Sequence, residues 1–464
     1  MIGSFENHRN QQVTVSIEEL VEPNHFLRTV EQMIDFSFID QIATPYYCQN
    51  NGRPSIPPIT LFKMLFIGYF YGIPSERKLE QEIKHNVAYR WFLGLSFQDK
   101  VPDHSTISFN RKKRFQDSTV FEDIFDEIVC QAKEHRMVDG RILIADSTHV
   151  KANANKNKFI RTAKKKSVPV YIDQLEQAVQ QDREAHGKKH LGPLKENKEP
   201  KPGQKPKTTR ISKTDPDSGF LMRSQKPQGF FYLDHRTVDA KYNIITDTWI
   251  TAGNVSDATP YLERLKVQKE KFQFPVEAVA LDAGFFTGYI CKTLHDENIF
   301  AVMGYRRTGG GNKKMPKRKF RYIPERECFV CPMGCILDYA NTDRNGYQQF
   351  KSRPEDCAGC PHRPDCFSEN TKQRTVTRHL WEPYKEKVRQ NKKSPEGKTV
   401  YSLRSQTIER SFADSKERHS FRYARCRGRS SVQEQAYLTA ACQNMKKIAL
   451  HLKKKERSLE NQAA

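Results

Sequence analysis

Two aspartates, Asp146 and Asp282, are the first candidates for chemistry in this chain. Each follows a short apolar run, residues 141–145 and 276–281, of the kind that forms a buried strand. A rigid strand fixes the backbone, and a carboxylate at its end projects into the crevice at the edge of the sheet. If the two strands are neighbours, the carboxylates repel each other unless a cation compensates them. We therefore expect Mg²⁺ or Mn²⁺ at this point.

Glu409 is the best third member of such a site. It lies in a predicted helix, residues 405–418, where Ile408 and Phe412 can anchor the apolar face. Lys416 follows two turns later on the same side as Glu409. Acids that share two metal ions can activate water or a 3′-hydroxyl for phosphoryl transfer. Taken singly, each aspartate is more typical of a turn or cap, and the Glu–Lys pair of a solvated helix face. Their joint occurrence favours a site.

A second cluster of reactive residues consists of cysteines. The chain has 11, and those between positions 328 and 366 form two Cys-x-x-Cys pairs, Cys328 with Cys331 and Cys357 with Cys360. Two such pairs can complete a tetrahedron around Zn²⁺ and leave no open position for catalysis. Other nearby candidates are Cys335, His362 and Cys366. The pattern predicts a structural zinc site, with reduced free thiols as the alternative.

The charge balance indicates a polyanionic partner. Lys and Arg number 78 against 55 Asp and Glu, a formal charge of +23 with a sequence pI near 9.5 in 464 residues. Nucleic acid is the first expectation, although ribosome-associated and membrane-surface proteins share such a surplus. No apolar run approaches the roughly 20 residues of a membrane helix, and the N-terminus lacks the order of a signal peptide. We expect a cytoplasmic protein.

Two basic segments are candidate contacts to DNA phosphates. The first precedes a predicted amphipathic helix at residues 120–133, and the second lies near the C-terminus. The first comprises Arg111, Lys112, Lys113 and Arg114, and the second comprises Arg422, Arg425, Arg427 and Arg429. Short helices around the first segment suit a DNA-binding module, and a helical packing or dimerisation domain is an equal alternative.

The pattern of elements changes at Met137. Residues 1–135 read as helices, with starts at Ser16 and Ser75 and a strongly apolar helix at 59–71. Strands and helices then alternate, which predicts an α/β domain. The expected strands are 141–146, a hairpin of 230–234 with 244–251, 276–282 and 299–303. The expected helices are 256–272, 289–297, 405–418 and 432–455.

Two insertions interrupt this α/β pattern. Residues 156–213 are rich in lysine and proline and predict a flexible basic segment with one helix near 170–184. The cysteine region forms the second. The predicted domains are a helical part, 1–135; a first core part, 137–304; an insertion, 305–400, with the cysteines at 328–366; a second core part, 401–455; and a tail, 456–464.

At these residues the chain resembles the DDE transposases of bacterial insertion sequences. Asp146-Ser-Thr-His and Leu281-Asp282-Ala-Gly-Phe match the motifs on the first and fourth strands of their ribonuclease-H-like domain. Ile408-Glu409-Arg-Ser-Phe with Lys416 matches the end of the Tyr-Arg-Glu-Lys signature of one large group. Tyr401 and Arg404 match its beginning, but four residues separate Arg404 from Glu409 where the signature has three. The segment from Arg53 to the Asp103-His-Ser-Thr motif resembles the N-terminal domain of these enzymes.

The resemblance implies a fold and a function. The fold is an α/β ribonuclease-H-like catalytic domain with a helical N-terminal domain and a small cysteine-rich zinc-binding insertion. The function is metal-dependent cleavage at transposon ends and strand transfer into target DNA, with Tyr401, Arg404 and Lys416 assisting the three acids. The expected partner is double-stranded DNA, bound by a nucleoid-associated homodimer. A nuclease that cuts without joining and a non-catalytic DNA-binding regulator are the alternatives. The complete set of three acids argues against the regulator.

Overall fold

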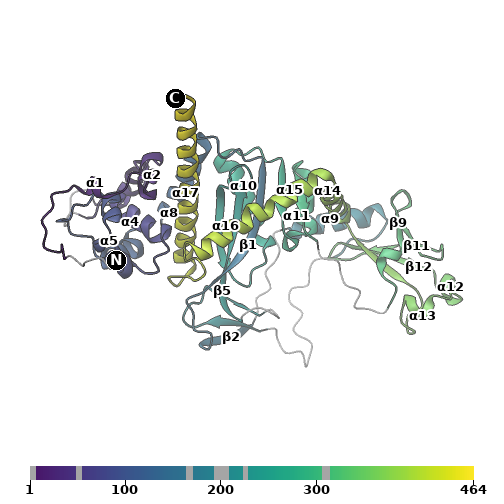
Figure 1. Cartoon of the computed structure of the whole chain (residues 1–464). Coiled ribbons are helices and arrows are strands. Elements are labelled where there is room, and N and C mark those ends of the chain that lie inside the picture. The colour runs from purple at the N-terminus through teal and green to yellow at the C-terminus, as the bar shows by residue number, and fades with distance from the viewer. Residues whose placement is uncertain are drawn as a thin grey trace, which may run out of the picture.

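The computed structural model describes residues 7–48, 55–163, 171–192, 208–222, 228–305 and 314–463. Arg53 and the stretches 164–170 and 193–207 of the lysine-rich segment lie outside these residues. Figure 1 shows a helical N-terminal part, a central sheet with its helices, and a lobe at the opposite end, arranged in a row. The long C-terminal helix stands between the first two parts.

The N-terminal part is helical, as predicted. The capping box at Ser16 is present. The Ser16 hydroxyl accepts a hydrogen bond from the Glu19 amide, and the Glu19 carboxylate accepts one from the Ser16 amide. Ser75 also caps a helix, and that helix ends at His85. Asn86 then caps a separate helix that begins at Val87. The helices are α1 (Ile17–Leu20), α2 (Phe26–Met33), α3 (Phe38–Ala43), α4 (Pro58–Phe70), α5 (Glu76–His85), α6 (Val87–Phe92), α7 (His104–Phe109) and α8 (Val120–Glu134). A π-helical turn, Asn110–Arg114, follows α7.

The central sheet has the order β4-β5-β1-β7-β8, with β6 also paired to β5. β1 runs antiparallel to β5 and parallel to β7, and β5 and β6 form the predicted hairpin. Counting β1, β5, β6, β7 and β8, Asp282 follows the fourth strand, as the resemblance implies. The strands are β1 (Ile142–Lys151), β4 (Gly219–Leu221), β5 (Gly229–Asp239), β6 (Ile245–Ala252), β7 (Ala278–Leu281) and β8 (Phe300–Met303). The arrangement is a ribonuclease-H-like α/β fold.

Helices pack around this sheet, and the chain returns to it earlier than predicted. α14 packs against β8 and α11, and α15 packs against β7, so the core resumes near Glu382 and not at 401. The predicted helix 405–418 is two helices, because Thr407 leaves the helical conformation with φ −109° and ψ −87°. The helices are α10 (Ala258–Phe272), α11 (Gly288–Asp296), α14 (Glu382–Lys393), α15 (Pro395–Gln406) and α16 (Ile408–Glu417).

Helix α17 (Arg429–Ala463) joins the N-terminal part to the sheet. It contacts α2, α4 and α8 on one side and β6 on the other, as Figure 1 also shows. Its buried residues Ala436, Ala440 and Ala449 are small, which allows a close approach of neighbouring backbones. A single hydrophobic core therefore runs from the N-terminal helices into the sheet. Residues 456–463 continue this helix and are not a separate tail.

The cysteine-rich lobe is built on an antiparallel sheet with the order β13-β12-β11-β10-β9. Its core consists of Phe320, Phe329, Leu337, Phe350 and Val376. The elements are β9 (Arg321–Ile323), β10 (Cys328–Val330), β11 (Ile336–Thr342), β12 (Tyr347–Ser352), α12 (Pro354–Ala358), α13 (Arg363–Cys366) and β13 (Thr375–His379).

The described parts of the lysine-rich segment 156–213 contain a helix and two strands, so the prediction of a largely flexible chain does not hold for these parts. The expected helix is present as α9 (Ile172–Ala185), and the strands β2 (Phe159–Ala163) and β3 (Thr208–Ser212) pair with each other. Asp182 of α9 accepts a hydrogen bond of 2.7 Å from Gln348 of β12. Leu175 and Val179 pack with Trp381. These apolar and polar contacts fix α9 on the lobe. Within the described residues, none of the helices has the length and apolarity needed to cross a bilayer.

Candidate active site

The register of the central sheet brings Asp146 and Asp282 to the same level. The parallel ladder of β1 and β7 ends with Ala145 opposite Leu281, so the next residue on each strand is one of the two aspartates. The prediction that β1 ends at Asp146 is wrong. On its other side β1 keeps pairing with β5 as far as Lys151, and only the ladder with β7 stops. The two carboxylates therefore lie where the sheet opens.

Asp146 lies in a partly buried and crowded environment. Its Oδ2 accepts a hydrogen bond of 2.6 Å from Arg404 Nη2, and its Oδ1 accepts one of 2.7 Å from the Ser147 amide. Burial raises the pKa of Asp146 to about 6, Arg404 and the amide oppose this, and the charges of Asp282 and Asp257 add to it. Arg404 and the Ser147 amide therefore do not fully compensate the negative charge of these neighbouring carboxylates. A divalent cation fits this environment, since hard oxygen ligands are what Mg²⁺ prefers.

Tyr401 of α15 lies among the predicted acids. Burial raises the pKa of its phenol, Arg404 opposes the rise, and the charges of Asp282, Asp146 and Glu409 add to it. The hydroxyl packs so closely on Gly304 that a Cβ at this glycine would lie 3.0 Å from it. Tyr401 is thereby held beside the end of β7.

Glu409 and Lys416 lie on α16, which contacts β1 and β5. Lys416 Nζ donates to Thr148 Oγ1 at 2.5 Å, two residues beyond Asp146 on β1. The Glu409 side chain is exposed. Among the described residues, the ligand atoms of Asp146, Asp282 and Glu409 do not all come within 4.8 Å of one another. The charges of all three acids act on the Tyr401 phenol, but the acids do not form a closed coordination shell.

A buried arginine that the sequence reasoning missed fixes α16 on the sheet. Arg236 of β5 is 1% exposed and forms an ion pair of 2.6 Å with Asp234. Its Nη1 donates to the hydroxyls of Ser411 and Ser415 on α16, each at 2.8 Å. The predicted strand 230–234 ends before Arg236, so no local pattern in the sequence pointed to this residue. Because a buried charge must be paired and hydrogen-bonded, this network determines the position of the helix that carries Glu409.

Asp257 is a fourth carboxylate near the site, and it too was missed. It precedes α10 and would ordinarily be interpreted as a helix cap. Its Oδ1 accepts a hydrogen bond of 2.6 Å from Ser147 Oγ, next to Asp146. Its other oxygen packs against Gly284, where a Cβ would lie 2.8 Å away. Since Ser147 and Thr148 face opposite sides of β1, α10 and α16 cover opposite faces of the sheet.

The first basic segment does not present four free cations. Arg111 is 8% exposed and pairs with Glu76 at 2.7 Å and with Glu434 at 3.2 Å. Arg114 stacks on the Tyr47 ring and donates to Ser55 and Asn110. This environment does not favour the predicted phosphate contact for Arg111, because a buried cation between two carboxylates is already neutralised. Lys112 and Lys113 are exposed.

The arginines of the second basic segment also differ in their exposure to solvent. Arg422, Arg427 and Arg429 are exposed. Arg422 pairs with Glu417, and Arg427 Nε donates to the Asn153 carbonyl at 3.0 Å. Arg425 is half-buried and lies 4.2 Å above the Tyr69 ring.

Five cysteines line one small cavity of about 30 Å³ in the lobe. They are Cys331, Cys335, Cys357, Cys360 and Cys366. The Cys335 amide donates to Cys331 Sγ at 3.3 Å, as in a metal knuckle. Cys328 is buried in β10 opposite Ile323 and does not line this cavity, whereas Cys335 does. Within the described residues, no three thiols lie within 4.8 Å of one another.

Comparisons with known proteins match two parts of the chain. Residues 15–113 match a family model described as a transposase domain (DUF772), and residues 330–449 match a transposase DDE domain. The comparison with curated proteins found no match. Among solved structures, the chain is similar to a piggyBac transposase synaptic complex with hairpin DNA, at 9% identity and a TM-score of 0.36. That likeness covers 92% of this chain and 76% of the other, and is too weak to support an inference.

Proposed function

The chain is a DDE transposase, and we propose that its site is built from Asp146, Asp282 and Glu409. The proposed reaction cuts DNA at the ends of a mobile element and joins the freed 3′ ends to target DNA. The observation that carries the proposal is the register of β1 and β7, which sets the two motif aspartates side by side. The raised pKa of Asp146 supports it, because crowded carboxylates are characteristic of a cation site.

DDE transposases use divalent metal ions, and we propose Mg²⁺ or Mn²⁺ held by Asp146, Asp282 and Glu409. When bound, such ions stabilise the charge that develops in phosphoryl transfer and lower the pKa of bound water. In the first step an oxygen of water bonds to phosphorus and the 3′ oxygen leaves. In the second step the oxygen of that 3′-hydroxyl bonds to a phosphorus of the target strand, and the 3′ oxygen of the target leaves. One site serves both steps, because only the nucleophile differs.

Other side chains would orient the acids and the phosphate. Arg404 holds Asp146 Oδ2 and thereby fixes which oxygen stays available. Tyr401, packed on Gly304, fills the space beside the end of β7 and keeps its hydroxyl near the acids. Lys416, fixed on Thr148, brings positive charge to the side of the crevice where a phosphate would lie.

The remaining parts of the proposal concern partners. DNA contacts from Lys112, Lys113, Arg422, Arg427 and Arg429 are supported by their exposure. A structural Zn²⁺ in the lobe is supported by the five thiols around one cavity. A homodimer on DNA would allow one molecule for each end of an element.

The test of this proposal compares three single variants with a matched control. Asp146→Asn, Asp282→Asn and Glu409→Gln keep the side-chain shape but remove the charge that would hold metal. We expect each to abolish cleavage in Mg²⁺ while binding of the element ends persists. Glu417→Gln removes a carboxylate from the exposed end of the same α16 and should cut normally. Near-normal cleavage by any of the three variants would remove that residue from the site.

A further inference from the structure

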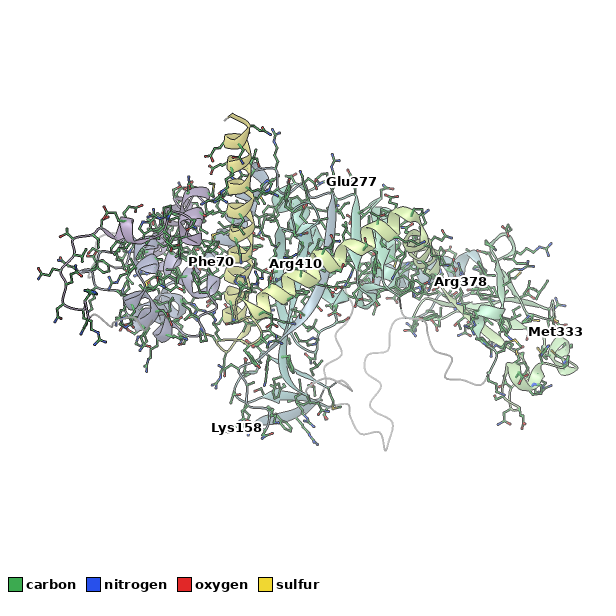
Figure 2. The ribbon with its side chains drawn as sticks, viewed as in Figure 1. Phe70, Lys158, Glu277, Met333, Arg378 and Arg410 are labelled. Atoms are coloured by element: carbon green, nitrogen blue, oxygen red, sulfur yellow. The ribbon has the colours of Figure 1, made fainter. Side chains whose placement is uncertain are left out.

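A groove outside the active site lies between α16 and α17. This α16–α17 groove is a cavity of about 300 Å³. It is bounded by the turn between β5 and β6, by the junction of α15 and α16, and by one face of α17. Figure 2 labels Arg410 at this place, on α16 where the helix passes α17.

Positive side chains dominate the groove. Arg410, Arg418, Lys446 and Lys447 line it together with a single carboxylate, Asp414. Asp414 pairs with Arg418 at 3.5 Å, and Lys447 donates to the carbonyl of Asn243. Arg410 and Lys446 form no hydrogen bond or ion pair with any residue that the structure describes. Four basic side chains therefore share one acid.

This crowding is unfavourable in the absence of an anion. Burial lowers the pKa of Lys446, and Arg418 lowers it further. Burial together with Arg236 and Arg410 lowers the pKa of Lys447 to about 7, and only Asp414 opposes this. Like charges held close together in a partly desolvated cavity cost free energy unless an opposite charge joins them. The groove is therefore suited to binding an anion.

We propose that the α16–α17 groove binds a phosphate of the DNA backbone. Arginine and lysine donors from two helices suit the several oxygens of a phosphate, and the cavity is large enough to admit one. Arg410 directly follows Glu409, about 100° further around the same helix. A backbone phosphate held here would therefore fix the position of α16 relative to DNA from a side distinct from the acids.

The identity of the phosphate as DNA rests on the proposed function, while the anion site itself does not. Free inorganic phosphate offers the same oxygens and charge. A duplex brings a row of phosphates, so its binding releases counterions and depends steeply on salt. The two sources can thus be separated by measuring duplex binding and inorganic phosphate binding on the same variants.

The experiment uses the full chain in buffer with a metal chelator, so that catalysis does not enter. The test variant is Arg410→Ala with Lys446→Ala. The control is Lys454→Ala with Lys455→Ala, which removes the same number of charges from an exposed, more C-terminal turn of α17. Affinity for a random duplex of about 30 base pairs is measured over a range of salt concentrations. Loss of one phosphate contact should lower the slope of log K against log salt by about 0.9.

We expect the duplex affinity of the groove variant to fall about tenfold and its slope of log K against log salt to fall by about one. Both quantities should fall less in the control. The melting temperature of the groove variant should stay equal or rise, because removing cations relieves repulsion. A lower melting temperature would indicate a structural role and overturn the proposal, as would duplex binding equal to the control. If inorganic phosphate stabilises the parent and not the variant while duplex binding is unchanged, the assignment to DNA is overturned. Failure of the parent to cut element ends would instead contradict the proposed function.

Discussion

Burial of the Asp146 carboxylate costs free energy that Arg404 only partly offsets. A pKa of about 6 in place of 3.8 means that the charged form is disfavoured by up to roughly 3 kcal/mol in the folded protein. Its side chain is only 20% exposed, so solvent screens little of this. A site that must hold cations retains such strain, because binding of the ion removes it.

Asp257 should act as a positioning residue, through Ser147. We expect Asp257→Asn to lower the cleavage rate about tenfold or more while end binding is unchanged, as loss of an outer-shell partner does in metal sites. The defect should shrink at high Mg²⁺ concentration, since weaker metal binding is then compensated.

The measurement is the cleavage rate as a function of Mg²⁺ concentration. Glu270→Gln, an exposed acid at the far end of α10, is the matched control. An equal defect at all Mg²⁺ concentrations, together with a lower melting temperature, would assign Asp257 a structural role only.

The three proposed acids could be selected from the sequence because each leaves a local signal. Asp146 and Asp282 follow apolar runs, and Glu409 lies in an amphipathic helix. Asp257 and Arg236 left no such signal, because their roles depend on contacts with residues far away in the chain, such as Ser147 and Ser411. The burial of Arg111 was missed for the same reason, since its partner Glu434 lies on α17.

At the scale of elements, the break between α15 and α16 accounts for the unusual spacing in the Tyr-Arg-Glu-Lys signature. In a continuous helix, residues four apart point about 40° apart, and residues five apart point about 140° apart. Arg404 and Glu409 are five apart. The non-helical conformation of Thr407 interrupts the helix between them and resets its direction. One extra residue is thereby accommodated, and both side chains remain near Tyr401.

The lobe allows a prediction about metal content. Freshly purified, reduced protein should contain about one Zn²⁺ per chain by elemental analysis. Cys357→Ser should lose the zinc and unfold the lobe locally, because structural zinc sites contribute to folding directly. Cys328→Ser should keep it, since this thiol does not line the cavity. Absence of zinc from the parent, or its loss from the Cys328 variant alone, would contradict the assignment.

The overall order of elements was predictable from periodicity, but the packing between distant elements was not. The hairpin of β5 and β6 and the strand β7 follow from local apolar patterns. The docking of α9 on the lobe does not, because it depends on long-range contacts such as that of Asp182 with Gln348.

At the scale of the whole molecule, Arg111 links the N-terminal part to α17. It bridges Glu76 on α5 and Glu434 on α17. Arg111→Ala should destabilise the protein by about 3–5 kcal/mol, because two carboxylates are left without their partner. Lys112→Ala with Lys113→Ala should leave stability unchanged and weaken duplex binding.

Chemical denaturation and duplex titration of both variants check these two predictions. A stable Arg111 variant with weakened DNA binding would restore the original expectation of a phosphate contact.

The most direct test of the proposed site and reaction is an in vitro assay on the DNA that flanks the coding region. A labelled duplex carrying a terminal inverted repeat is incubated with the parent chain, Mg²⁺ and a supercoiled target plasmid. We predict cleavage at the end of the repeat, followed by covalent joining of the labelled 3′ end to the plasmid, and neither product with Asp282→Asn. Cleavage without joining would identify a nuclease of the same fold. Equal product from the parent and Asp282→Asn would contradict the proposed active site.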